Sequence, residues 1–241
     1  LHMHAAAHRR WADARHKSSR LDHDSAGPNR APTPQSDQGA HALTALIDSL
    51  ERTVTRLEWS ADGTTWSDYY QRTNYSDAAF ARKRELVGNA IARLRPSTVW
   101  DLGANDGTFS RIASDAGIST IALDVDPAAV EHNYRQVKAR GDRHLLPLLA
   151  DLANPTARLG WANAERMSLV DRGPADVALA LALVHHLAIG HNVPLPRIAA
   201  FLASVCRALV IEFVPKDDSQ VQRMLAARAD VFANYHRTAF E

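Results

Sequence analysis

Residues 99–109 read Val-Trp-Asp-Leu-Gly-Ala-Asn-Asp-Gly-Thr-Phe, and this stretch decides the fold of the chain. Its apolar start is typical of a buried strand, while Gly103 and Gly107 allow a bend without side-chain bulk. A helix that starts after such a bend points its free N–H groups at whatever lies beyond the strand end. The stretch therefore predicts a strand, a glycine turn and a helix that together hold a nucleotide-like ligand.

The same turn departs from the dinucleotide-binding pattern Gly-x-Gly-x-x-Gly. Asn105 stands at the position of the second glycine and Thr108 at that of the third. A nicotinamide-dependent oxidoreductase would use the same kind of sheet and turn, so it stays an alternative that the spacing weakens.

The composition fits one globular domain in a chain of 241 residues, of which 46% are hydrophobic. Its 28 Lys and Arg and 27 Asp and Glu leave a formal net charge of +1, which argues against a nucleic-acid partner. The single cysteine, Cys206, excludes an internal disulfide and cannot form a cysteine metal site alone, so we expect no metal and a reducing compartment. No apolar run is long enough to cross a bilayer and the start is unlike a signal peptide, so we expect a cytoplasmic protein without a membrane partner.

The sequence beyond the first strand alternates between strand and helix patterns. The apolar runs predict strands at residues 98–102, 119–123, 145–150, 176–182 and 208–213, with helices in the segments between them. Continuous apolar strands joined by helices are typical of a parallel sheet covered on both faces. We therefore predict an α/β fold with a doubly wound, mainly parallel sheet.

Composition divides the chain into three parts. Residues 1–41 are poor in large apolar side chains and predict a mobile linker or the remnant of a preceding domain. Residues 42–97 predict N-terminal helices, the first of them with apolar residues at helical spacing from 43 to 57, and an aromatic lid in which Tyr75 could lie over a cofactor. Residues 98–241 form the predicted core.

Acidic residues lie at the ends of the first two predicted strands, and in a doubly wound sheet the ligand lies beyond the strand ends. Asp101 leads into the turn formed by Gly103, Asn105 and Gly107, so these four residues are predicted to contact the cofactor. Asp124 ends the second strand, and its two oxygens can accept hydrogen bonds from both hydroxyls of a ribose. Asp126 precedes a proline, which suits a helix cap better than a ligand contact.

Three further residues are candidates for a catalytic role: His186, His185 and Glu212. The two histidines follow the fourth strand, and adjacent strand residues point to opposite sides, so we place His186 nearer the pocket. A histidine there is either a general base or a structural side chain packed over the cofactor. Glu212 lies within an apolar run, where an unpaired carboxylate is costly, so we expect it to be hydrogen-bonded or to hold substrate.

The turn resembles the first motif of class I S-adenosylmethionine-dependent methyltransferases, which commonly reads Asp-x-Gly-x-Asn-x-Gly. Residues 42–241 are similar to a bacterial family of these enzymes, some labelled nodulation-protein-like, above all in four segments besides the turn: 74–80, 160–163, 183–189 and 211–216. The resemblance implies a Rossmann-like fold, S-adenosyl-L-methionine as the cofactor, and adenine contacts from Asp151 and Leu152.

The resemblance also implies a longer parent chain, whose N-terminal region would be a partner of this portion. A class I fold closes with an antiparallel hairpin after the fifth strand, and we expect that hairpin to be truncated here. The open sheet edge would then reduce stability or promote self-association.

The implied reaction is transfer of the sulfonium methyl group to a nucleophile that the resemblance does not identify. A small molecule or a protein is favoured over nucleic acid, because no Asn-Pro-Pro-Tyr or Asp-Pro-Pro-Tyr segment follows the fourth strand. A non-catalytic module that only binds S-adenosylmethionine remains an alternative.

Overall fold

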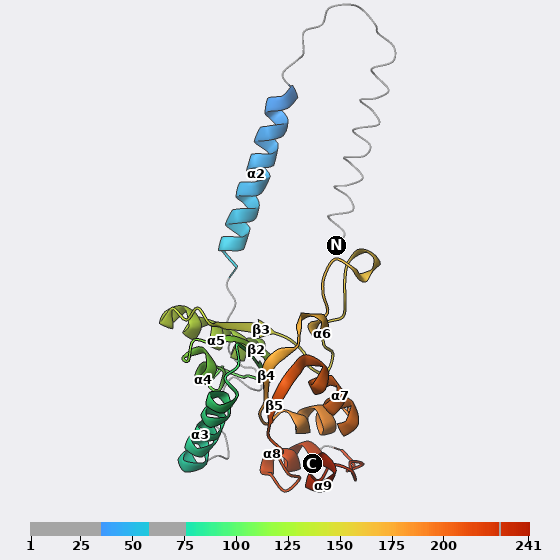
Figure 1. Ribbon diagram of the computed structural model, residues 1–241. Helices are drawn as coiled ribbons and strands as arrows, with labels where there is room; N and C mark the ends of the chain where they lie inside the picture. The colour runs from blue at the N-terminus through green and yellow to red at the C-terminus, as the bar shows by residue number, and fades with distance from the viewer. Residues whose placement is uncertain (1–34, 58–75, 227) are drawn as a thin grey trace, which may run out of the picture. The chain divides into compact units, whose positions relative to one another are not determined.

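The computed structural model describes residues 35–57, 76–226 and 228–241 (Figure 1). The chain divides into two compact units, Leu1–Trp59 and Ser60–Glu241. The predicted lid residue Tyr75 lies outside the described residues.

Helix α2 (Gln35–Thr55) is the described part of the first unit. It begins seven residues before the predicted start at residue 42, so residues 35–41, which composition assigns to a linker, are helical. Its large apolar side chains are exposed in the structure. No helix among the described residues is both long and apolar enough to cross a bilayer.

The second unit is built on a five-stranded sheet whose strands lie in the order β3-β2-β1-β4-β5. The strands are β1 (Thr98–Leu102), β2 (Ser119–Asp124), β3 (Leu145–Leu149), β4 (Ala175–Ala180) and β5 (Cys206–Ile211). Every neighbouring pair is parallel. The strand order reverses between β1 and β4, which is the pattern of a doubly wound, Rossmann-like sheet. The predicted fold class is confirmed.

The helices of this unit lie mostly between the strands along the chain. They are α3 (Asp77–Leu94), α4 (Ser110–Ser114), α5 (Pro127–Arg140), α6 (Leu169–Arg172), α7 (Leu195–Val205), α8 (Ser219–Ala226) and α9 (Arg237–Phe240). Ser76 caps α3 by accepting a hydrogen bond from the Ala79 amide. The described residues after β5 contain α8 and α9 and no further strand, so the expected closing hairpin has no counterpart among them.

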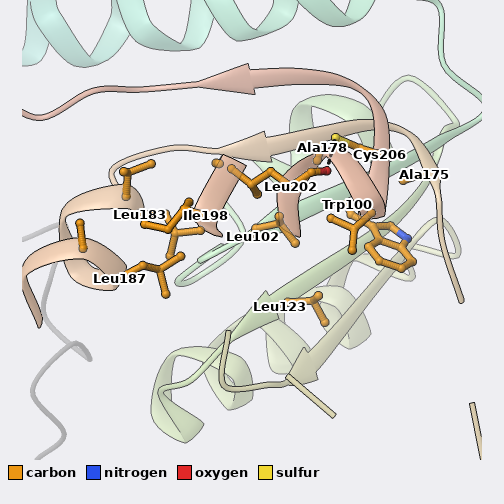
Figure 2. Close-up of a cluster of buried hydrophobic side chains, with 14 of the residues drawn as sticks. Trp100, Leu102, Leu123, Ala175, Ala178, Leu183, Leu187, Ile198, Leu202 and Cys206 are labelled. Atoms are coloured by element: carbon orange, nitrogen blue, oxygen red, sulfur yellow. Dashed lines mark hydrogen bonds between the residues drawn. The ribbon is translucent and has the colours of Figure 1, made fainter. Parts of the chain in front are cut away.

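Alternating side chains of the strands bury the two faces of the sheet. On one face Trp100 and Leu102 of β1 pack with Leu202 of α7, and Figure 2 shows this cluster. On the other face Val99 packs with Val87 and Ile91 of α3. Cys206 belongs to the first cluster, where its thiol lies 3.2 Å from the Leu202 carbonyl oxygen (Figure 2). The sheet is therefore a rigid layer, and it fixes the positions of the residues at its carboxyl edge.

Candidate cofactor site

A pocket opens at the carboxyl ends of the strands, where the strand order reverses. It brings together seven of the residues predicted from sequence: Asp101, Gly103, Asn105, Asp124, Asp151, Leu152 and His186. Gly107, His185 and Glu212 are not among its lining residues. Seven of the ten described candidate residues therefore line one pocket, as expected if strand ends hold the ligand.

The glycine turn is held to strand β2 by main-chain hydrogen bonds. The amides of Gly103 and Ala104 both donate to the Leu123 carbonyl, at 2.8 and 3.0 Å. Gly103 has a φ of +78°, and a Cβ placed on it would lie 3.2 Å from the Leu183 side chain. A side chain at Gly103 would therefore strain the turn and narrow the pocket.

Asp124 joins the ends of two strands through both carboxylate oxygens. One oxygen accepts a 2.7 Å hydrogen bond from the Asn105 amide and the other a 2.8 Å bond from the Asp126 amide. Burial raises the pKa of Asp124, while these two main-chain bonds oppose the rise. The Val125 amide adds a third main-chain bond, and the two oxygens, with about four lone pairs between them, keep capacity to accept from a ligand. Asp126 caps α5 by accepting from the Ala128 amide at 2.8 Å, so its predicted capping role is confirmed.

Asp101 is the second buried carboxylate of the pocket, with 2% of its surface exposed. Its carboxylate accepts a 2.6 Å hydrogen bond from the Ser110 hydroxyl. Burial raises the pKa of Asp101 to about 6, although the Ser110 bond lowers it, and the nearby charge of Asp124 adds to the rise. A ligand that brings a positive charge or a strong donor would stabilise the ionised carboxylate here.

Gly107 is needed for packing behind the turn. Its φ is +78°, and a Cβ placed on it would lie 2.3 to 2.6 Å from the carboxamide of Asn133 on α5. Asn133 is buried and accepts a 3.0 Å hydrogen bond from Arg111, which also donates to the Asp106 carbonyl at 2.8 Å. The glycine therefore lets α5 and Arg111 brace the turn from outside the pocket.

The residues after β3 also line the pocket. Asp151 and Leu152 line the pocket, and the Asp151 carboxylate accepts a 2.8 Å bond from the Ala153 amide. This bond leaves the second oxygen of Asp151 for a ligand. In the segment between β3 and β4, where the sequence predicts a helix, the structure has the 3₁₀ turn η2 (Trp161–Asn163) and the one-turn helix α6.

The two histidines lie side by side in the structure. Their ring centroids are 4.0 Å apart, so the expectation that they point to opposite sides is wrong. The reason is that β4 ends at Ala180 and a π-helical turn, η3 (His186–Gly190), follows, so strand alternation no longer applies. His186 lines the pocket, as predicted, whereas His185 is buried beside it.

Burial keeps both imidazoles neutral. It lowers the pKa of His185 to about 4 and that of His186 to about 3. Nδ1 of His185 is buried without a hydrogen-bond partner among the described residues. A ring whose pKa is this low accepts hydrogen bonds but is a weak base at neutral pH.

Lys83 is a pocket residue that the sequence analysis missed. Its ammonium lies 2.7 Å from the Glu212 carboxylate and 4.8 Å from the centroid of the Phe109 ring. Glu212 is thus ion-paired, which agrees with the expectation that it would not be buried alone. The available signal was helical spacing: Lys83 lies three residues after Phe80 and four before the buried Val87, on the inward face of α3.

Comparison with known proteins gives one relative in sequence and several in structure. No protein family model matches the chain. The chain is 36% identical over 201 residues to the nodulation protein NoeA of Rhizobium meliloti (strain 1021), a match that covers 83% of this chain and 42% of NoeA. The chain thus spans less than half the length of that relative.

The similar solved structures are more distant. The bifunctional kinase-methyltransferase WbdD has a TM-score of 0.47 and 17% identity, covering 70% of this chain and 36% of WbdD. A SAM-dependent methyltransferase from Thiobacillus denitrificans, crystallised with S-adenosyl-L-homocysteine, has a TM-score of 0.41 and 19% identity, covering 58% of this chain and 49% of that one. The resemblance to nodulation-protein-like sequences that the motifs carry is confirmed by the NoeA match, which makes this chain a sequence relative of NoeA.

Proposed function

We propose that this chain is an S-adenosyl-L-methionine-dependent methyltransferase. The observation that carries the proposal is the convergence of two buried carboxylates, Asp101 and Asp124, on one pocket at the point where the strand order reverses. An ionised carboxylate can accept hydrogen bonds but cannot donate them, so the pocket suits a ligand with several hydrogen-bond donors. The ribose hydroxyls and the α-ammonium group of S-adenosylmethionine are such donors. The sequence similarity to NoeA supports a bacterial protein of the resembled family.

The pocket residues fit the parts of this cofactor one by one. Asp124 would accept from the two ribose hydroxyls, and Asp151 with the Leu152 amide would meet the adenine. Asp101 would accept from the α-ammonium group, while Lys83 brings a positive charge suited to the α-carboxylate. Gly103 and Asn105 would let the main chain approach the ligand. The bound cofactor supplies a methyl group on a sulfonium leaving group, and the residues of the chain orient it and exclude water.

His186 is the candidate that would face the methyl acceptor. Because its imidazole is neutral and weakly basic, it would accept a hydrogen bond from a hydroxyl or amine and orient it rather than remove its proton. His185 would support His186 through ring contact, and Glu212 would hold Lys83 in place. We propose a small molecule or a protein side chain as the acceptor, since the net charge of +1 provides no basic field for nucleic acid.

The weak basicity of the histidines also favours a second candidate, a module that binds S-adenosylmethionine without methylating anything. A nicotinamide-dependent oxidoreductase is less favoured. The chain has a Tyr-x-x-x-Lys sequence, Tyr134 to Lys138, but Tyr134 is an exposed residue of α5, and neither residue is among those lining the pocket.

Titration calorimetry of the 241-residue chain tests the cofactor class. We expect S-adenosyl-L-homocysteine to bind with a dissociation constant in the micromolar range, and NADH to release no heat under the same conditions. Binding of NADH with no binding of S-adenosylhomocysteine by folded protein would replace the proposal with the oxidoreductase. Binding without methyl transfer to any acceptor class, by the full-length protein, would favour the non-catalytic module.

The raised pKa of Asp101 predicts a pH dependence of binding. A protonated Asp101 cannot pair with the α-ammonium group, so affinity for S-adenosylhomocysteine should rise with pH through about 6 and level off near pH 7. At pH 5 about a tenth of the carboxyl is ionised, so affinity should be about tenfold lower than at pH 7. Calorimetry at a series of pH values measures this.

The Asp101→Asn variant is the control for that profile. It should bind weakly at every pH, with the step near pH 6 removed. The native state of the unliganded wild type binds the extra proton between about pH 4 and pH 6, so the Asp101 contribution to the free energy of unfolding falls as pH rises through that window. Asp101→Asn should therefore be the more stable protein at neutral pH in the absence of ligand. An unchanged pH profile in the variant would remove Asp101 from the ligand site.

A further inference from the structure

Helix α2 presents a continuous apolar face to solvent. Five side chains on it, Leu43, Leu46, Ile47, Leu50 and Val54, and Leu57 two residues beyond its end, are between 54% and 72% exposed. The rest of the helix surface carries small and polar residues, among them Ala45, Asp48 and Arg52. Exposing so many large apolar groups to water is unfavourable in free energy, and contiguous apolar surface of this kind marks an interaction site.

The helix also has weak intrinsic stability. Its 21 residues include Gly39 and three threonines, Thr44, Thr53 and Thr55, which are all poor helix formers. Most of the stability of a helix in a protein comes from packing of its apolar face rather than from the helix propensity of its residues. Packing of the apolar face must therefore supply the missing stability.

The spacing on that face identifies what covers it. Leu43, Ile47, Leu50, Val54 and Leu57 are separated by steps of four, three, four and three, which is the a/d pattern of a heptad repeat. Ile47 and Val54, both β-branched, occupy a positions, and all three leucines occupy d positions. Branched residues at a with leucine at d favour two parallel strands over three or four.

The flanking positions agree with pairing of identical helices. In a parallel pair each g residue faces the e residue of the next heptad in the partner. Leu46 at g would face Glu51 at e, so no like charges are brought together, and the leucine widens the apolar contact. The four core side chains of α2 and Leu46 from each copy, at roughly 100 Å² apiece, would bury on the order of 1,000 Å², the size at which specific interfaces begin.

We infer that α2 is the dimerisation element of this protein, forming a parallel two-stranded coiled coil with α2 of a second copy of the chain. The contact pairs two copies of the unit Ser60–Glu241 without using any residue of the pocket. Because the apolar repeat spans only residues 43–57, about two heptads, the dimer should be reversible and dissociate on dilution.

Sedimentation velocity of the 241-residue chain over a range of concentrations tests the dimer. The wild type should shift from monomer to dimer as concentration rises. Leu50→Glu places a carboxylate at a central d position against its copy and should weaken dimerisation at least tenfold. Ala45→Glu adds the same charge at an f position on the opposite face and should leave dimerisation unchanged. Neither substitution lies in the unit Ser60–Glu241, so the midpoint of thermal unfolding of that unit should be the same in both variants as in the wild type.

The orientation of the pair is tested by crosslinking. Under mild oxidation Leu43→Cys should give a covalent dimer, because parallel pairing places the two copies of this d position opposite each other. Ala45→Cys, on the outer face, should not crosslink, and the native Cys206 is buried in β5. A wild type that stays monomeric at every concentration, or equal effects of the two glutamate variants, would overturn the proposal. A dimer that Leu43→Cys cannot crosslink would overturn the parallel arrangement.

Discussion

Replacing Gly107 by alanine is expected to destabilise the protein by about 2–5 kcal/mol. Two costs add. The backbone at Gly107 has a φ of +78°, a conformation that costs an L-residue roughly 1–2 kcal/mol. The new Cβ would also lie 2.3 Å from the Asn133 carboxamide, and crowding of a packed interior costs a further 1–3 kcal/mol or so.

The clash cannot be relieved cheaply, because Asn133 is itself buried and bonded. It is 1% exposed and accepts the hydrogen bond from Arg111, which in turn holds the Asp106 carbonyl in the turn. Moving Asn133 would therefore shift the glycine turn as well as α5. We expect binding of S-adenosylhomocysteine to weaken together with the free energy of unfolding, which urea denaturation measures.

Gly117→Ala is the matched control for Gly107→Ala. Gly117 has nearly the same φ, +76°, but a Cβ placed on it would meet no atom within 4 Å. Only the backbone cost should appear, about 1–2 kcal/mol, with cofactor binding unchanged. Equal losses in the two variants would show that backbone strain alone, and not contact with Asn133, sets the requirement for glycine at position 107.

The sequence was sufficient to predict the sheet and much of the pocket. Strand runs such as Val177 to Ala182, which includes most of β4, are apolar without interruption, so their parallel arrangement and the position of their ends could be read directly. The place of Asp101 and Asp124 in the pocket could be predicted because both lie at strand ends, and a parallel sheet brings the carboxyl ends of its strands to one side. The same rule does not say which way a side chain after the strand turns, and this is where His185 was misplaced.

The parts that could not be predicted depend on contacts between distant elements. Lys83 reaches the pocket only because α3 packs with its Val87 face on the sheet, and sequence periodicity gives that face but not the residues across from it. The role of Gly107 depends on Asn133, which lies 26 residues further along the chain on α5. A glycine in a binding motif is easily assigned to the ligand when the group that needs the space is another side chain.

Asp124→Ala is expected to lower the affinity for S-adenosylhomocysteine about a thousandfold. Hydrogen bonds to a charged acceptor are each worth about 1.5–3 kcal/mol, and the proposed ribose contact has two of them. The variant also removes the acceptor for the Asn105 and Asp126 amides, so part of the loss reflects a turn that is less well held. Calorimetry with folded variant protein measures the affinity, and urea denaturation measures the accompanying loss of stability.

Asp176→Ala is the control that separates the loss of a ligand contact from the loss of main-chain hydrogen bonds. Asp176 also accepts main-chain hydrogen bonds, but at the amino ends of the strands. Its carboxylate accepts hydrogen bonds from the Ser97 and Thr98 amides at 2.9 and 3.1 Å, at the start of β1 and away from the pocket. Its loss should lower the free energy of unfolding by an amount similar to the structural part of Asp124→Ala and leave the affinity unchanged. If Asp124→Ala lowered stability alone, as Asp176→Ala should, then Asp124 would serve only to join the turn to β2. The ribose contact, and with it the fit of the pocket to an adenosyl cofactor, would have to be abandoned.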